Sequence, residues 1–133
     1  MKKLVSLALI LTLVLVGMFA GTASAEVTKD TIKVGLILLH DENIGYDEIH
    51  LNGFMDMVKN LGLREDQYMI KYNVPENEEC YDAAVDLAEA GCDIIFADSF
   101  GHETYMMLAA SEYPNIQFCH ATGYQAATSG MTN

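Results

Sequence analysis

Four apolar stretches of the chain carry the pattern of strands in a parallel sheet. Ile32–Leu39 is almost continuously apolar, with two interruptions, as expected of a strand buried on both faces. Tyr68–Val74 alternates more between apolar and polar residues, which favours a strand nearer the sheet edge. Asp93–Ala97 and Ile116–His120 are short and rich in residues that favour β-structure. The pattern therefore predicts four strands.

Three amphipathic segments between these strands predict helices. In each, apolar residues recur every three or four positions, the spacing of one buried helix face. These residues are Leu51, Phe54, Met55, Val58 and Leu61 in the first segment, Tyr81, Ala84, Val85 and Ala88 in the second, and Tyr105, Leu108 and Ala109 in the third. Gly62, Gly91 and Pro114 follow the three segments and are typical of helix ends.

Strict alternation of strands and helices predicts an α/β fold with a parallel sheet and right-handed crossovers, as in Rossmann-like proteins. The sequence stops at residues 131–133, where a fifth strand of such a sheet is expected to begin. We therefore expect a sheet that is truncated before its fifth strand.

Residues 1–25 have the pattern of a cleaved export signal. Lys2 and Lys3 precede the apolar run Leu4–Phe19, and Ala23–Ala25 provides small residues for cleavage. A membrane-spanning helix is the alternative, but it needs about 20 apolar residues, and this run is shorter. Glu26 stands where a lipoprotein has Cys, so we expect an exported protein of residues 26–133 without a lipid anchor or a membrane span.

The chain is strongly acidic. It has 7 basic and 19 acidic residues among 133, a formal net charge of −12. Two of the basic residues and none of the acidic ones lie in the predicted signal, so the exported part is more acidic still. This balance argues against nucleic acid or an anionic membrane surface as a partner.

Sequence motifs of metal sites and common enzymes are absent. The three cysteines have no C-x-x-C spacing and are interpreted as core residues, although export leaves one disulfide open. His40, Asp41, Glu42 and His50 lack the spacing of a metal motif. Neither a G-x-G-x-x-G loop nor a G-x-S-x-G elbow occurs. We therefore predict no catalytic residue, metal or cofactor, and a flavodoxin-like enzyme or receiver domain is a disfavoured alternative.

Ligands of parallel α/β sheets bind beyond the carboxyl ends of the strands, which directs attention to the loops there. Two aromatic residues there could stack on a flat ligand, and polar residues could bind its edge. Tyr46 could instead cap a helix, Phe100 could pack into the core, and Asp41 could be merely solvated. The candidate ligand-binding residues are Asp41, Asn43, Tyr46, Ser99, Phe100, Gly101 and Thr122.

The stretch Cys92–Tyr124 resembles the first lobe of the basic membrane protein family of ABC-transporter solute-binding proteins. Those lobes carry a similar strand and loop, matched here by Asp93–Ala97 and Ser99–Gly101. An aromatic–Pro–x–x–x–Phe strand ending in HATGY follows, matched by Tyr113–Tyr124. Tyr46 falls where the family has Trp, whereas the Gly-Pro start of the family's first loop is missing. The role of His120 in HATGY, structural or ligand-binding, stays open.

The resemblance implies the N-terminal lobe of a two-lobe periplasmic binding protein, without the second lobe. It implies capture of a small solute, a purine base or a nucleoside, and delivery to ABC permease and ATPase subunits at the outer face of the cytoplasmic membrane. A receptor that uses the same lobe for ligand sensing is the alternative function.

Overall fold

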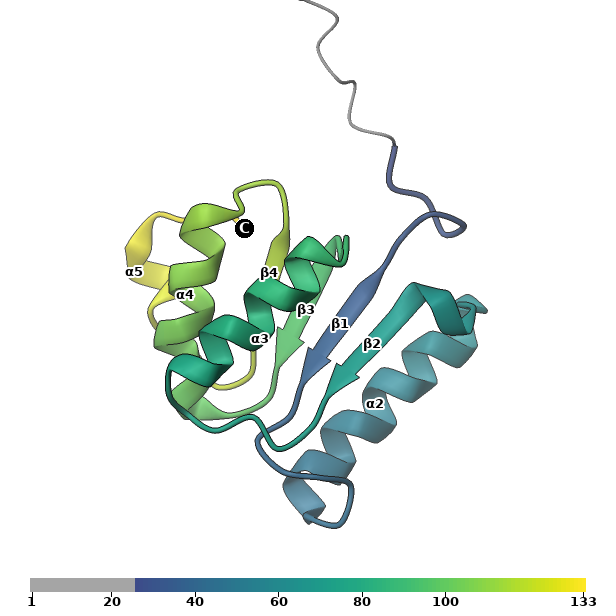
Figure 1. Ribbon diagram of the computed structural model, residues 1–133, viewed down its shortest axis with the longest axis horizontal. Coiled ribbons are helices and arrows are strands. Elements are labelled where there is room, and N and C mark those ends of the chain that lie inside the picture. The colour runs from purple at the N-terminus through teal and green to yellow at the C-terminus, as the bar shows by residue number, and fades with distance from the viewer. Residues whose placement is uncertain (1–25) are drawn as a thin grey trace, which may run out of the picture.

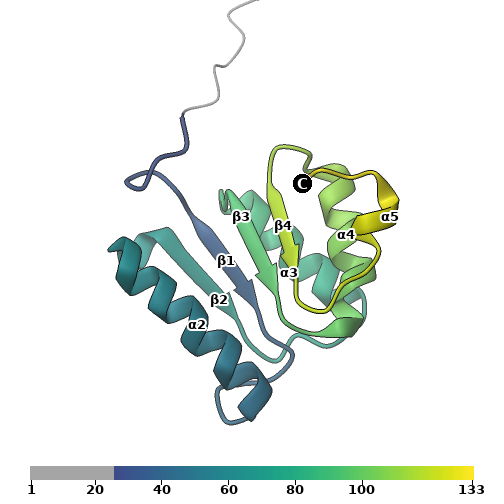
Figure 2. The same cartoon turned by 180° about the vertical axis from the view of Figure 1, so that it is seen from behind.

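The computed structural model describes residues 26–133, which form a four-stranded parallel sheet with helices on both faces (Figures 1 and 2). The predicted export signal lies outside the described residues. The sheet has the order β2-β1-β3-β4. Its strands are β1 (Val34–Ile37), β2 (Tyr68–Lys71), β3 (Ile94–Ala97) and β4 (Gln117–His120).

The predicted strands are confirmed, each as a shorter segment within its predicted range. β2 lies at the sheet edge, as its alternating pattern indicated. In the parallel register Ile37 pairs with Lys71 on one side and with Ala97 on the other, and Ala97 pairs with His120. All four strands therefore end at the same edge of the sheet.

Helices α3 (Glu78–Glu89) and α4 (Glu103–Glu112) cover one face of the sheet, and α2 (Gly45–Leu61) packs on the other face. Alternate residues of each strand supply the two faces, as the pleat requires. Ile37 and Ile95 contribute to the core beneath α3 and α4, whereas Leu36 and Phe96 face α2. The remaining elements are short: α5 (Ala126–Ser129) and the 3-10 helices η1 (Glu65–Gln67) and η2 (Phe100–His102).

Glycine and asparagine set the helix boundaries. Gly62 ends α2 in the left-handed conformation, at φ 66°, as the sequence predicted. The Asn77 side chain accepts a hydrogen bond from the Glu79 backbone N–H at 2.8 Å and so caps the start of α3. Within β1, a Cβ on Gly35 would lie 2.9 Å from Leu87, so glycine lets α3 pack close to the sheet.

The predicted buried faces of all three helices were partly wrong, and on α2 the predicted Leu61 is 44% exposed. On α4 the buried residues are Glu103, Met106, Ala109 and Ala110, whereas Leu108 is 50% exposed. On α3 burial is deepest at Cys80, Ala84 and Leu87. Periodicity could not show that a buried Glu occupies a core position of α4, and the buried stripe is rotated as a result.

Two leucines that differ in burial test this core. We expect Leu87→Ala to lower the free energy of unfolding by about 2–5 kcal/mol, because it leaves a cavity in the core. The matched control Leu108→Ala should cost about 0.5 kcal/mol or less, because that side chain is half exposed. Urea denaturation of both variants measures the difference, and equal losses would contradict the packing described here.

Candidate functional site

The loops that follow the four strands meet at the carboxyl edge of the sheet. β1 leads into the segment 38–44 before α2, and β3 leads into Asp98, Ser99 and η2. Backbone hydrogen bonds join these segments, from Asp98 N–H to the Ile37 carbonyl and from Asn73 N–H to the His40 carbonyl. The edge is therefore a connected surface on which the candidate residues from separate loops are gathered.

Two buried carboxyl groups hold the first loop. Asp47 Oδ1 accepts a hydrogen bond from the His40 backbone N–H at 2.7 Å, and Asp98 Oδ1 accepts one from the Leu39 N–H at 3.1 Å. Both aspartates are 1% exposed. Sequence reasoning missed them as a pair, although an Asp directly after a buried strand was a signal that could have found Asp98.

The same two side chains are close enough to shift each other's pKa. Burial and then the charge of Asp47 raise the pKa of Asp98 to about 6. Burial also acts to raise the pKa of Asp47, but hydrogen bonds from His40 and Asp98 hold it below its usual range. The pair therefore keeps a proton on Asp98 at mildly acidic pH.

Tyr46 lies at the start of α2 and connects two loops. Its hydroxyl donates a hydrogen bond to the Asp98 carbonyl at 3.0 Å, and its ring lies 4.5 Å from the His50 ring. The residue remains 48% exposed, so one part of the ring is accessible to a ligand. Asp41 Oδ1 accepts the Asn43 N–H at 3.0 Å, a local turn on the same surface.

Glu76, which follows β2, fixes the loop after β3. Its Oε1 accepts hydrogen bonds from the Ser99 hydroxyl and from the Gly101 N–H, the latter at 2.9 Å. The Ser99 hydrogen bond, followed by that of Gly101, lowers the pKa of Glu76. A Cβ at Gly101 would lie 2.4 Å from the carboxyl carbon of Glu76 and 2.6 Å from its Oε1. The Ser99 side chain is therefore buried and hydrogen-bonded to Glu76. The absence of a Cβ at Gly101 allows the Glu76 carboxylate to approach the backbone.

His120 and Glu103 fix the loop after β4. The His120 ring donates through Nε2 to the Ser99 carbonyl, because a carbonyl can only accept. Glu103 Oε1 accepts the N–H groups of Tyr124 and Gln125. Burial acts to raise the pKa of Glu103, but these hydrogen bonds outweigh it and lower the pKa. Within HATGY, His120 and the Tyr124 N–H thus take part in holding these loops.

Two aromatic side chains lie exposed on these fixed loops. The Phe100 and Tyr124 rings are stacked, with centroids 6.2 Å apart and planes inclined by 22°. Their exposed fractions are 60% and 64%. Phe100 does not pack into the core, the alternative considered above. Thr122, between β4 and Tyr124, is exposed and adopts φ 64°. Tyr124 was missed as a site candidate, since its position relative to Phe100 depends on the tertiary fold.

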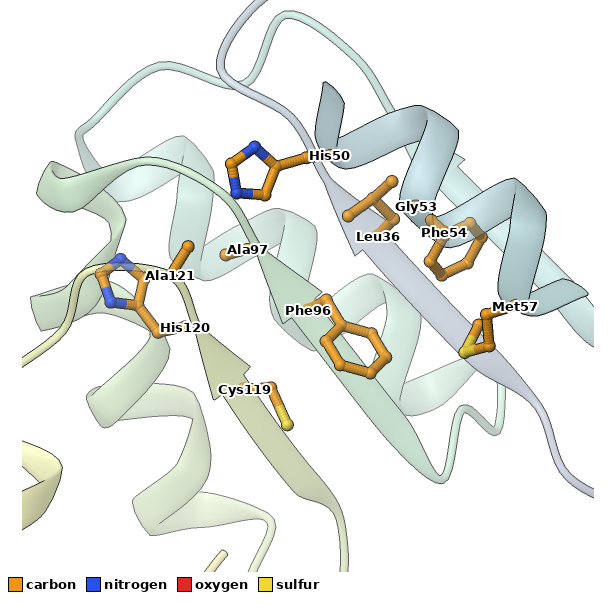
Figure 3. Close-up of a pocket in the computed structure, with 10 residues that line it drawn as sticks. All are labelled: Leu36, His50, Gly53, Phe54, Met57, Phe96, Ala97, Cys119, His120 and Ala121. Carbon is orange, nitrogen blue, oxygen red and sulfur yellow. The ribbon is translucent and has the colours of Figure 1, made fainter. Parts of the chain in front are cut away.

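A separate apolar groove of about 360 Å³ lies on the sheet face beside α2 (Figure 3). Leu36, Phe96 and Cys119 project into it from β1, β3 and β4, and Phe54 and Met57 approach from α2. His50 and His120 lie at its carboxyl end. The groove offers few polar groups and differs in character from the aromatic surface at the strand ends.

The described residues contain no group of three or more His, Cys, Asp or Glu side chains that could hold a metal ion. Cys80 and Cys92 are buried and Cys119 is half-buried, and all three are free thiols. Burial raises the pKa of Cys80 to about 12 and that of Cys92 to about 11, so neither is a ready nucleophile. In residues 26–133 no helix is long and apolar enough to cross a membrane.

Comparison with known proteins identifies a relative by sequence. The chain is 31% identical over 111 residues to a purine-binding protein of Brucella abortus, a match covering 83% of the chain and 31% of that protein. This match supports the resemblance to a lobe of the basic membrane protein type. No family model matches it.

A solved structure shows the same fold. An ABC transporter solute-binding protein from Conexibacter woesei superposes with a TM-score of 0.62 at 16% identity, over 73% of this chain and 31% of that one. The chain thus spans about a third of the length of each of these two proteins. The lobe's α/β fold, predicted from alternating strands and helices, is confirmed.

The hydrogen bonds around Glu76 generate a test. We expect Glu76→Ala to release the 99–101 loop and lower the free energy of unfolding by about 1 kcal/mol, whereas Glu76→Gln keeps an oxygen acceptor and should cost less. Because the pKa of Glu76 is lowered in the folded lobe, its stabilisation is present above the ordinary pKa of 4.5 and is lost as pH falls through the lowered value.

Hydrogen exchange at the Gly101 amide, measured with urea denaturation, follows both effects. Equal exchange in Glu76→Ala and the unsubstituted lobe would contradict this role.

Proposed function

We propose that this lobe is part of an extracytoplasmic solute-binding protein that delivers a purine base or a nucleoside to an ABC importer. The sequence match to a protein named for purine binding supports the ligand class. The fold shared with an ABC transporter solute-binding protein supports the transport role. Both proteins are named for binding, so binding without chemistry is the function we infer.

The exposed Phe100–Tyr124 pair is the observation that carries the ligand proposal. Large aromatic faces that stay exposed on rigid loops are suited to stacking on a flat heterocycle. Glu76 and Glu103 hold the two loops, so little ordering is needed when a ligand binds. Tyr46 offers a further aromatic face across Asp98, at the start of α2.

The polar candidates divide into two groups. Ser99 and Gly101 are engaged by Glu76, so we assign them to shaping the loop and not to reading the ligand edge. Asp41, Asn43 and Thr122 lie at the surface and remain candidates for polar contact with a base or a ribose. Backbone groups of the same loops supply further donors and acceptors.

Export and partners form the remainder of the proposal. Residues 1–25 would direct the protein across the cytoplasmic membrane, and residues 26–133 would form the N-terminal lobe of a two-lobe protein. A second lobe would supply the opposite wall of the cleft, closing over the solute by hinge motion. The permease and ATPase subunits would then receive the solute-loaded protein.

Aromatic substitutions test the ligand surface in a protein that carries both lobes. We expect Phe100→Ala to weaken purine binding by about tenfold, because a stack contributes roughly 0.5–1.5 kcal/mol beyond buried area and ~1.4 kcal/mol corresponds to tenfold. Phe100→Tyr should retain most of the affinity, since it preserves the aromatic face. Calorimetry with adenine, adenosine, guanosine and inosine measures both variants.

Tyr46 provides a second comparison. Tyr46→Phe keeps the ring but removes the hydrogen bond to the Asp98 carbonyl, whereas Tyr46→Ala removes both. Stacking predicts that only the Ala variant loses about tenfold in affinity. Unchanged affinity in Phe100→Ala and Tyr46→Ala, or no purine binding by the unsubstituted protein, would overturn the proposal.

A further inference from the structure

The buried Asp47–Asp98 pair has a chemistry that ligand binding alone does not require. Both carboxyl groups are 1% exposed and bind the consecutive N–H groups of Leu39 and His40, and two buried carboxylates so placed favour keeping one proton between them. Asp98 Oδ1 already accepts the Leu39 N–H, whereas Asp98 Oδ2 is buried with no other hydrogen-bond partner among the described residues. The proton therefore belongs on Asp98 Oδ2.

The histidines around the pair do not take up this proton. His102 is fully buried, and its Nε2 donates to the Val74 carbonyl at 2.8 Å. Its Nδ1 lies 3.9 Å from Asp98 Oδ1, and burial lowers the pKa of His102, which disfavours the charged ring. His40 Nδ1 lies 3.3 Å from Asp47 Oδ2 but its side chain is half exposed.

The other charged groups nearby act on this cluster through their charge. His50 on α2 attracts the Asp98 charge, while Glu76 after β2 and His120 after β4 act on His102. None of them is hydrogen-bonded to either aspartate. When the shared proton leaves, two negative charges remain buried near each other inside the lobe, and buried like charges are costly.

We propose that Asp47 and Asp98 are positioning residues for the first loop of the candidate site, and that the proton they share sets how firmly this loop is held. Asp47 binds the His40 N–H, Asp98 binds the Leu39 N–H, and the Asp98 carbonyl binds the Tyr46 hydroxyl. Losing the proton loosens the loop that carries Asp41 and Asn43. That this loop contacts solute rests on the proposed function, but its pH-dependent order does not.

The direction of the effect follows from linkage. The pKa of Asp98 is raised in the folded lobe from 3.8 to about 6, so the shared proton favours the closed loop. This stabilisation is present at low pH and is lost as pH rises through about 6. Between pH 5 and pH 8 the closed loop should weaken by about tenfold relative to its locally open state.

Hydrogen exchange at the Leu39 and His40 amides tests the proposal in the full chain without any ligand. After correction for intrinsic exchange rates, we expect protection of both amides to fall by about tenfold from pH 5 to pH 8. Asp98→Asn supplies a permanent donor to Asp47 and should keep protection constant. Asp47→Asn also removes the like-charge contact and serves the same purpose if Asp98→Asn does not fold.

Asp56→Asn is the matched control, because it removes one negative charge from the exposed side of α2 and should retain the tenfold fall. Histidine side chains ordinarily titrate in this window, so the comparison between variants decides the outcome. Constant protection in the unsubstituted chain, or an undiminished fall in both Asn variants, would overturn the proposal. Failure of purine binding would instead count against the proposed function alone.

Discussion

Parallel pairing of β1 between β2 and β3 is the constraint on which the rest of this lobe depends. A parallel strand needs a crossover of a dozen or more residues to its partner, so a helix must follow each strand. The register then brings Ile37, Lys71, Ala97 and His120 to one edge of the sheet. Every loop that could touch a ligand emerges at that edge, whatever its own sequence.

Pairing alone places the loops but does not fix their shapes, and acidic side chains, three of them buried, supply that second step. Asp47 and Asp98 bind the backbone of the loop after β1, Glu76 binds the loop after β3, and Glu103 binds the loop after β4. Asp98, Glu76 and Glu103 each bind the N–H groups of a loop that is distant in the sequence. Asp47 is the exception, because His40 is only seven residues away. The acidic composition of the chain thus contributes to the architecture of the site as well as to its surface charge.

The sequence was sufficient for the elements and insufficient for the contacts between them. Apolar runs predicted the four strands, and Gly62 predicted the end of α2, because both depend on local backbone and burial preferences. The rotated face of α4 was missed because Glu103 is buried by hydrogen bonds from the loop that follows β4. Nothing in the local pattern around Glu103 reveals those distant partners.

The candidate site shows the same division. Tyr46, Phe100 and Thr122 were proposed from their positions after strands, and they lie on the surface at the predicted edge. Ser99 was interpreted as a ligand contact, but its hydroxyl binds Glu76, 23 residues away in the chain. The stacking of Phe100 on Tyr124 likewise joins two loops whose approach is decided by the pairing of β3 with β4.

The central claim is that solute binds at the carboxyl edge and not in the apolar groove beside α2. A nuclear magnetic resonance titration of the full chain with adenine and inosine, at millimolar concentrations, tests it most directly. The account predicts shifts of the ring signals of Phe100 and Tyr124, with little change at Leu36 and Phe96 in the groove. Shifts confined to the groove residues, with the Phe100 and Tyr124 signals unmoved, would contradict it.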